Sequence, residues 1–313
     1  MSCSKRLIPF ERCTMTRVRS MRSGNIPRMA EPTIHVGRSY QRYEGRIDED
    51  ATVAFALATN DPNEICRQGR AVPPLYTVSL ILPAYMEAQQ KAADPGAIRN
   101  VRGGMAGGHD VHIINPLRAG MEVSWQATTY NARQTAKGAV VTQRIVVSDR
   151  EGAPLVEHFW WSFLIGGEID EDVGPDLADH RFPAGVRERI VATHTIEVAR
   201  DQGFRFAGVS GDHNPHSMDD EAARREGFPG KILQGMCTFA MCGGAIVKVG
   251  AGGDPNRLRR LAGRFSAPVF PGRPIVVHAY DASEGEQGRR ILAFEATQDA
   301  RTVLEHGRAE LSA

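Results

Sequence analysis

An internal duplication constrains the fold of this chain more than any other feature of the sequence. Residues 55–63 (FALATNDPN) and residues 206–214 (FAGVSGDHN) share the pattern F-A-x-x-[ST]-[NG]-D-x-N at an offset of 151 residues. A second pair, INPLRAG at residues 114–120 and SAPVFPG at residues 266–272, repeats its proline and its last glycine at an offset of 152. Two matches at nearly one offset predict two structurally equivalent halves.

Both halves show the same order of features: a polar segment, an apolar helical stretch, a P-x-x-x-G turn and alternating strands. EVSWQATTY, AVVTQRIVVSD and PLVEHFWWSFLIG are typical of strands in the first half, as are PIVVHAYDA, RRILAFEATQD and TVLEHGRAEL in the second. The pattern predicts an α+β fold with one helix against each antiparallel sheet. The acidic, Gly- and Pro-rich residues 166–185 predict a surface linker. We therefore expect a first repeat at 33–175 and a second at 176–313.

Two helices are expected in the second half. DDEAARREG predicts a short helix from Asp219 to Glu226, with acidic residues in its first turn and Gly227 as a stop signal. QGMCTFAMCGGAIVKVG predicts a mostly buried central helix with Gly235 at its amino end. Gly243 and Gly244 lower the helix propensity of this segment. We therefore expect them to permit a close approach by the sheet or by the other half.

The composition favours a soluble, cytoplasmic globular protein. Lys and Arg number 38 against 37 Asp and Glu, and a net charge of +1 provides no general attraction for nucleic acid or an anionic membrane. The five cysteines lack a CxxC pair, which is against a disulfide framework and a zinc site. No run reaches the ~20 apolar residues of a membrane span. His109 and His112 alternate as on a strand, and we expect no metal there.

The amino end is basic, with Glu11 as the one acidic residue before Glu31. Because no apolar segment accompanies the basic residues, a secretory signal is not indicated. A transit peptide and a nucleic-acid arm are alternatives, but we expect residues 1–32 to be a disordered leader, with Met21 or Met29 as other possible starts.

A polar segment at residues 211–220 (GDHNPHSMDD) concentrates the titratable side chains of the second half. Taken alone, Asp212 suits an Asx turn or a helix cap. His213 and His216, taken singly, suit surface or packing positions. The segments around this one decide between a structural and a catalytic interpretation.

Three segments, in order, resemble the MaoC-like dehydratases, also called R-specific enoyl-CoA hydratases. They are SGDxNP at residues 210–215, GFxxKILxGMCTF at residues 227–239 and RFxxPVxPG at residues 264–272. From about Thr33, the first half is similar to the degenerate amino-terminal repeat of two-repeat members. The resemblance implies a tandem (double) hot-dog fold, in which a central helix is wrapped by an antiparallel sheet in each repeat and the sheets join edge to edge.

The resemblance also implies an activity. Members of the family add water to a trans-2-enoyl thioester, or remove it from an (R)-3-hydroxyacyl thioester, without a redox cofactor or a metal. Their pattern D-x-N-P-[LI]-H-x-D places its first Asp on Asp212, its Asn on Asn214 and its last Asp on Asp219. These matches favour a catalytic Asp212.

Two positions depart from the family pattern. Ser217 stands at the position of the catalytic histidine, and His216 stands at the preceding aliphatic position. Gln234 stands where the family often has a histidine, directly before the oxyanion-hole glycine, Gly235. Hydration needs a base for water and an acid for C2; a carboxylate and an imidazole titrate in the useful range, whereas a serine hydroxyl does not. Charge on the thioester oxygen needs amide donors at a helix amino end, where Gly235 is expected.

Three hypotheses follow for this site. In the first, His216 or His213 turns into the site and replaces the missing imidazole. In the second, Asp212 works alone, with a water held by Ser217 and Asn214. In the third, the site is inactive, and the chain binds an acyl thioester or serves as a partner subunit. We favour activity, because an idle site would have little reason to keep its matching residues together.

In the first half, the equivalents of Asp212, Asn214 and Ser217 are Asp61, Asn63 and Cys66. Pro73 and Pro74 remove two N–H groups where an oxyanion hole would form. This half is therefore expected to accommodate the acyl chain rather than perform chemistry. Four apolar residues, mostly core, are alternatives for a tunnel lining: Leu75, Val78, Leu82 and Met86.

A basic cluster is expected to bind the phosphates of coenzyme A or of an acyl carrier protein. Its members are Arg257, Arg259, Arg260 and Arg264 in NRLRRLAGRF, with Lys231 before the glycine turn. Arg264, Arg260 and Lys231 are the main candidates, and a solvated basic face is the alternative. We therefore predict a hydratase or dehydratase of acyl thioesters, acting on acyl-CoA or an acyl carrier protein, as a homodimer with no nucleic-acid or membrane partner.

Overall fold

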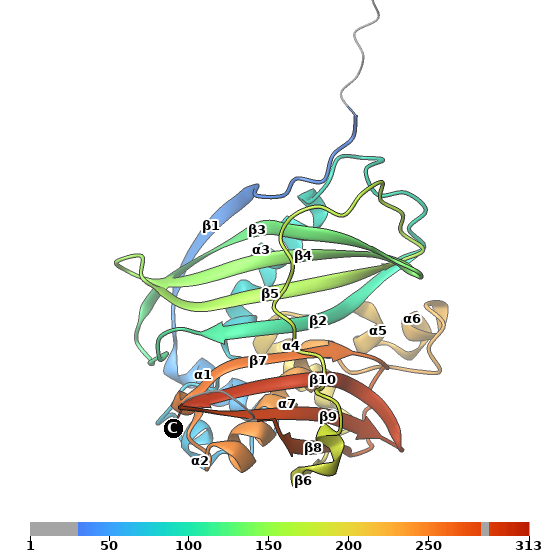
Figure 1. Ribbon diagram of the computed structural model, residues 1–313. Helices are drawn as coiled ribbons and strands as arrows, with labels where there is room; N and C mark the ends of the chain where they lie inside the picture. Colours follow the sequence, from blue (N-terminus) through green and yellow to red (C-terminus); the bar gives the residue numbers. More distant parts are fainter. Residues whose placement is uncertain (1–30, 283–287, 313) are drawn as a thin grey trace, which may run out of the picture. The chain divides into compact units, whose positions relative to one another are not determined.

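Within residues 31–282 and 288–312, which the computed structural model describes, ten strands form one continuous antiparallel sheet (Figure 1). Their order is β1-β3-β4-β5-β2-β7-β10-β9-β8-β6. Apart from Glu31, the described residues belong to the unit that begins at Pro32. The predicted leader, apart from Glu31 and Pro32, lies outside the described residues.

The two halves present their elements in matching order. The first half contains β1 (Ser39–Arg46), α1 (Glu49–Ala58), α2 (Glu64–Arg67), α3 (Thr77–Lys91), β2 (Gly103–Ile113), β3 (Glu122–Thr135), β4 (Gly138–Asp149) and β5 (Pro154–Ile165). The second half contains η1 (Val186–Glu188), β6 (Ile190–Ile196), α4 (Gln202–Ser210), α5 (Pro215–Met218), α6 (Asp220–Arg225), α7 (Gly235–Gly250), η2 (Pro255–Arg257), β7 (Leu258–Phe265), β8 (Ile275–Asp281), β9 (Arg289–Gln298) and β10 (Arg301–Ser312). Both predicted helices of the second half are confirmed, as α6 and α7.

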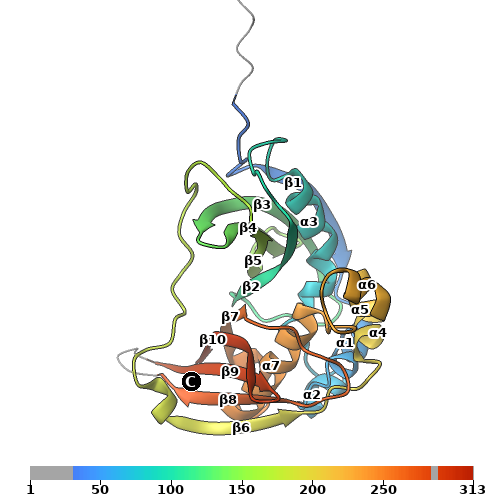
Figure 2. The same ribbon diagram turned by 90° about the vertical axis from the view of Figure 1, so that its right-hand side faces the viewer.

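The sheet is symmetric about the pairing of β2 with β7, which joins the halves in register from Gly108↔Arg264 to His112↔Arg260. Each half adds its strands outward in the same order, so that β1 and β6 form the two edges. Figure 2 shows α3 and α7 on one side of the sheet and the linker on the other. The predicted α+β fold, with two sheets joined edge to edge, is confirmed.

The duplicated phenylalanines lie at the centre of a core that both halves share. Phe55 and Phe206 are fully buried, and their ring centroids are 6.0 Å apart. A single cluster of buried apolar residues includes both of them together with Ile81 of α3 and Phe239 of α7. Truncating one such ring to alanine costs about 3–5 kcal/mol. The duplicated motif therefore holds the two repeats together as well as shaping each one.

The paired glycines of α7 permit two different close approaches. A Cβ at Gly243 would lie 2.9 Å from Cδ2 of Leu261 in β7, so the Leu261 side chain would have to shift to admit it. A Cβ at Gly244 would lie 3.1 Å from Cδ of Pro62 and 3.3 Å from the carboxyl carbon of Asp61. Both predicted reasons for these glycines are confirmed, since one meets the sheet and the other meets the first half.

A buried ion network lies at the junction of the halves. Arg260 of β7 donates hydrogen bonds from Nε and Nη2 to the carboxylate of Asp110 in β2, including Nη2 to Oδ2 at 2.8 Å, and one from Nη1 to Glu310 of β10 at 3.3 Å. It also donates to the carbonyl of Ala178 in the linker, at 3.2 Å. Because both carboxylates are buried, they need this guanidinium as their counter-charge.

No helix in the described part of the chain has the length and apolar character to cross a membrane.

Candidate active site

The predicted catalytic aspartate lies in a tight turn between two helices. Gly211 is the C-cap of α4, and its φ of 74° is the left-handed conformation that favours glycine. Asn214 is the N-cap of α5, and Pro215 is the first residue of that helix. In this turn, Oδ1 of Asp212 accepts a hydrogen bond from the backbone N–H of Asn214 at 3.2 Å. The carboxyl of Asp212 therefore forms the Asx turn and is also the candidate catalytic group.

The Asp212 carboxyl lies close to α3 and α7. Its burial raises its pKa, while the N–H of Asn214 and the nearby His216 and His213 act in the opposite direction. Its negative charge in turn contributes to raising the pKa of Tyr85 in α3 to about 12, although burial of that phenol is the larger cause. A half-buried carboxyl with a raised pKa suits an acid–base group.

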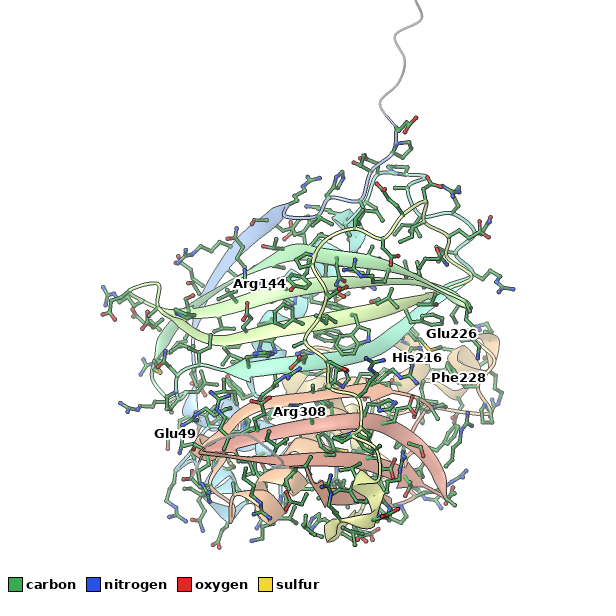
Figure 3. All side chains as sticks on the ribbon, in the orientation of Figure 1. Glu49, Arg144, His216, Glu226, Phe228 and Arg308 are labelled. Atoms are coloured by element: carbon green, nitrogen blue, oxygen red, sulfur yellow. The ribbon has the colours of Figure 1, made fainter. Side chains whose placement is uncertain are left out.

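Ser217 and His216 point in different directions from the short helix α5. Ser217 is 2% exposed, and its Oγ has no hydrogen-bond partner within the described residues. His216 instead turns toward the end of α6, where its Nδ1 lies 2.8 Å from Oε2 of Glu226 and its ring meets Phe228 edge-on (Figure 3). His213 is exposed. The structure thus places the serine inward and engages the neighbouring histidine with α6.

Gln234, the N-cap residue of α7, forms hydrogen bonds with α4 and with the Asp212 turn. Its side chain is 3% exposed, and its Nε2 donates to the carbonyls of Gly203 at 3.1 Å and Asp212 at 3.0 Å. Its Oε1 has no partner in the part of the chain that the structure describes. Sequence reasoning treated Gln234 only as a departure from a pattern. Its position directly before Gly235 was the signal for a role in the site.

The amino end of α7 lies beside this turn, and the N-cap residue Gln234 makes no side-chain cap hydrogen bond. The first N–H groups of a helix have no partner inside it. Gly235 packs against the other half and the sheet, since a Cβ there would lie 3.2 Å from Cε2 of Phe265 and 3.5 Å from Cβ of Ala106. The predicted position of Gly235 at the start of the central helix is confirmed. Its role as an oxyanion donor stays a prediction.

The equivalent segment of the first half is more enclosed. Asp61 is 3% exposed, and its Oδ1 accepts hydrogen bonds from the N–H of Asn63 at 2.8 Å and from its Nδ2 at 2.7 Å. The same Nδ2 donates to the carbonyl of Gly244 in α7 at 2.9 Å. The thiol of Cys66 also hydrogen bonds to Asp61, whose pKa is raised by burial. This carboxyl is a packed structural group.

Aromatic side chains fill the space between α3 and β5 beside Asp212. Tyr85 stacks on Trp160 with ring centroids 3.9 Å apart, and its hydroxyl lies 2.5 Å from Oγ of Ser162. Of the four apolar residues considered for a tunnel, Met86 is 49% exposed. The other three are buried in the core: Leu75, Val78 and Leu82. The interpretation of most of them as core is confirmed.

The predicted phosphate cluster is dispersed, because NRLRRLAGRF forms β7 and not an open basic face. Arg260 was wrongly expected to be available to a ligand, since its guanidinium is held in the buried network with Asp110 and Glu310. Arg264 is exposed and pairs with Glu305, and Lys231 lies 5.2 Å above the ring of Phe204. Arg257 and Arg259 donate to main-chain carbonyls.

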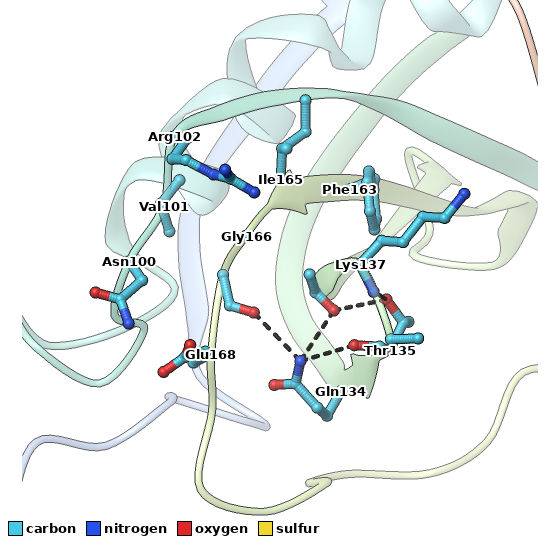
Figure 4. Close-up of a pocket in the computed structure, with 13 residues that line it drawn as sticks. Asn100, Val101, Arg102, Gln134, Thr135, Lys137, Phe163, Ile165, Gly166 and Glu168 are labelled. Atoms are coloured by element: carbon cyan, nitrogen blue, oxygen red, sulfur yellow. Dashed lines mark hydrogen bonds between the residues drawn. The ribbon is translucent and has the colours of Figure 1, made fainter.

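Two surface hollows are lined by residues other than Asp212. One, of about 900 Å³, is lined at the strand ends of the first half by Arg102, Gln134, Lys137 and Phe163, among others (Figure 4). Another, of about 430 Å³, is lined by residues around Arg70 and Arg118. Within the described residues, no group of three or more His, Cys, Asp or Glu side chains is arranged to hold a metal ion.

Solved structures with the same fold define the class of protein. The MaoC-like dehydratase of Phytophthora capsici superimposes with a TM-score of 0.76 and 20% identity, over 90% of this chain and 96% of that one. A conserved hypothetical protein of Mycobacterium tuberculosis, described as a double hot-dog fold, superimposes with a TM-score of 0.58 and 13% identity, over 88% and 96% of the two chains. The protein is therefore a double hot-dog protein.

The sequence matches assign a family to the second half of the chain. Residues 182–303 match the family described as MaoC like domain. The 3-hydroxyacyl-thioester dehydratase Y of Mycobacterium tuberculosis is 28% identical over 264 residues, covering 82% of this chain and 86% of that protein. The peroxisomal enoyl-CoA hydratase 2 of Arabidopsis thaliana is 40% identical over 93 residues, covering 27% of this chain and 30% of that protein. The second half of the chain is thus a MaoC-like domain, and the predicted resemblance to the MaoC-like dehydratases is confirmed.

Proposed function

We propose that the protein is a hydratase or dehydratase that interconverts trans-2-enoyl and (R)-3-hydroxyacyl thioesters, with coenzyme A as the thiol. One observation carries the proposal: Gln234 ties the Asp212 turn to the uncapped amino end of α7. A half-buried carboxyl and the amino-terminal N–H groups of α7, which have no side-chain cap, are thereby brought to one place. The names of the relatives, a dehydratase of 3-hydroxyacyl thioesters and an enoyl-CoA hydratase, support the same chemistry.

The reaction uses these groups in the following way. The Asp212 carboxylate accepts a proton from water as the water oxygen bonds to C3 of the enoyl thioester. The electron pair of the double bond moves toward the thioester, and the charge that develops on its oxygen is stabilised by the N–H groups at Gly235. A proton is then delivered to C2. Dehydration follows the same steps in reverse.

Two basic residues lie near the amino end of α7 and are the remaining candidates for the phosphates of coenzyme A. Lys231 precedes Gln234 by three residues, with its Nζ 3.9 Å from Oδ2 of Asp220. Arg264 precedes Phe265, which packs on Gly235. Because both side chains retain exposed surface, phosphate oxygens have access to them.

The direct test is the hydration of crotonyl-CoA and of a longer trans-2-enoyl-CoA, measured as loss of the conjugated absorbance. We expect the wild type to be active and Asp212→Asn to be inactive. A silent wild type that still binds saturated butyryl-CoA would favour the second candidate, a non-catalytic thioester-binding subunit, for which Ser217 in place of an imidazole is the supporting observation. The homodimer and the cytoplasmic location stay predictions of the sequence.

A further inference from the structure

We propose that Ser217 and Gln234 together bind the reacting water molecule, and that Asp212 alone transfers the proton to and from it. The inference rests on the proposed function. It assigns the binding of the water to two uncharged side chains, in a site that has a serine at the position of the family's histidine. It also gives Gln234, a residue outside the matched catalytic pattern, a defined position in the site.

Two unpartnered polar atoms of the site carry this inference. Ser217 and Gln234 are 2% and 3% exposed, and neither Oγ of the serine nor Oε1 of the glutamine has a hydrogen-bond partner within residues 31–282 and 288–312. Buried polar atoms are nearly always paired, with protein or with an ordered water. Where several such atoms converge, an internal water is the usual partner.

The two residues converge on one glycine of α4. A Cβ at Gly203 would lie 3.1 Å from the backbone carbonyl oxygen of Ser217 and 3.4 Å from Oε1 of Gln234, so the main chain of Ser217 and the side chain of Gln234 lie against the same glycine. The Gln234 amide is oriented by its N–H groups, which donate to Gly203 and Asp212. Its Oε1 is therefore left as an acceptor, close to the Asp212 turn.

These atoms match the hydrogen-bonding capacity of one water molecule. The Ser217 hydroxyl donates to the water oxygen, and the water donates one hydrogen to Oε1 of Gln234 and the other to the Asp212 carboxylate. One lone pair of the water oxygen is left to attack C3. An amide and a hydroxyl can thus orient the water without titrating themselves.

The proton balance closes on a single carboxyl. The water oxygen bonds to C3 while its O–H bond to the transferred proton breaks and Asp212 takes that proton. The π electrons of C2=C3 form the enolate, whose charge lies on the thioester oxygen. Asp212 then returns the proton to C2, and the carboxylate is regenerated. Addition therefore occurs on one face of the double bond, and no second acid is required.

His216 is the competing partner for Asp212. Its Nδ1 is engaged by Glu226, while the adjacent Ser217 takes the buried position of α5. An imidazole mechanism would make activity depend on His216 and leave it insensitive to Ser217 and Gln234. The two mechanisms are therefore separated by substitution.

The experiment measures crotonyl-CoA hydration for Ser217→Ala, Gln234→Leu and the double variant. We expect each single variant to lose about 10- to 100-fold in kcat with KM nearly unchanged, because the water is misplaced while the thioester still binds. Since both residues hold one water, the kcat of the double variant should be only slightly below that of the less active single variant. The Kd of saturated butyryl-CoA, unchanged in all three, shows that the thioester site is intact.

The chain offers matched controls in β4. Thr142 and Gln143 are also buried and also have unpartnered side-chain atoms, but they belong to the first repeat. Thr142→Val and Gln143→Leu should therefore keep wild-type kcat. Losses in these controls equal to those in the site variants would overturn the inference.

Other results overturn the inference in distinguishable ways. Single-variant losses that multiply in the double variant exclude a shared water. Unchanged kcat in Ser217→Ala and Gln234→Leu, with activity lost in His216→Ala, assigns the second role to the imidazole and leaves the proposed function standing. A wild type that hydrates no enoyl thioester overturns the proposed function together with the inference.

Discussion

The two aspartates of the duplicated motif occupy equivalent turns but differ in how fully their carboxyl oxygens are used. Asp61 is 3% exposed and accepts hydrogen bonds from the main chain and side chain of Asn63 and from the Cys66 thiol. Asp212 is half-buried, and its carboxyl accepts the one N–H of Asn214 at 3.2 Å. The Asp61 carboxyl is thus fully hydrogen-bonded to residues of its own repeat. The Asp212 carboxyl can still accept hydrogen bonds from a ligand.

The helices that follow these turns differ in the same sense. Before α3, Pro73 and Pro74 have no N–H, and the N–H of Tyr76 is used by the carbonyl of Pro73 at 3.0 Å. Neither helix has a side-chain cap, but Gln234 and Gly235 before α7 both keep their N–H groups. A repeat can therefore keep the fold and the aspartate yet lose a site, because catalysis depends on unused hydrogen-bonding groups that packing tends to consume.

Neutralising each aspartate in turn should give the largest contrast between the repeats. Asp212→Asn should lower kcat/KM for crotonyl-CoA by roughly 10²–10⁴-fold, since it removes the group that transfers the proton. Asp61→Asn, the matched change in the first repeat, should leave kcat/KM within about twofold. Equal losses in both variants would mean that Asp212 acts through the fold and not through the reaction.

Copying the proline of the first repeat into the second tests the amide donors. Gly235→Pro removes one N–H at a helix position where proline is tolerated, and kcat should fall by about 10²–10³-fold, as for loss of one oxyanion donor. Gly235→Ala is the control, because it keeps the N–H and adds a Cβ 3.2 Å from Phe265. Steady-state kinetics of the two variants should differ at least tenfold; similar losses would point to crowding.

The pH profile of hydration should report the burial of Asp212. The carboxylate is the reactive form, so kcat/KM should fall as pH decreases through the pKa of Asp212, by up to about tenfold per pH unit. Because burial raises that pKa, the acid limb should lie above 3.8, the ordinary value for aspartate. Initial rates between pH 4 and 8 measure it. The same limb should persist in Asp61→Asn, and a limb at or below the ordinary value would contradict the assignment.

The smallest effect concerns the stability of the first repeat. Burial raises the pKa of Asp61 in the folded state, so its protonated form favours folding and this contribution is lost as pH rises through the folded pKa. Asp61→Asn has no such loss. Its melting temperature relative to wild type should therefore increase by about 1–3 °C between pH 4.5 and pH 8. Scanning calorimetry at both values tests this, and a constant difference would refute it.

The features that sequence reasoning predicted correctly are those with a local signal. The repeat offset, the alternation of six strands and the turn residues around α6 and α7 depend on neighbours in the chain. The strand-like pattern of GGHDVHII, residues 107–114, also indicated β2. By contrast, the segment that forms β7 was interpreted as a basic cluster for phosphate, because closely spaced arginines look alike on a solvated face and on a central strand. Its pairing with β2 comes from a segment about 150 residues away.

The sequence by itself determined that the chain has two related halves, that the second half carries Asp212 before a helix beginning at Gly235, and that Ser217 replaces a histidine. Only the tertiary structure decided that Ser217 points inward, that His216 turns to Glu226 and that Gln234 joins the Asp212 turn to α4. It also decided that Arg260 is a buried counter-charge. The physical reason is that orientation, burial and hydrogen-bond saturation arise from contacts between residues distant in the chain, and no local pattern encodes them.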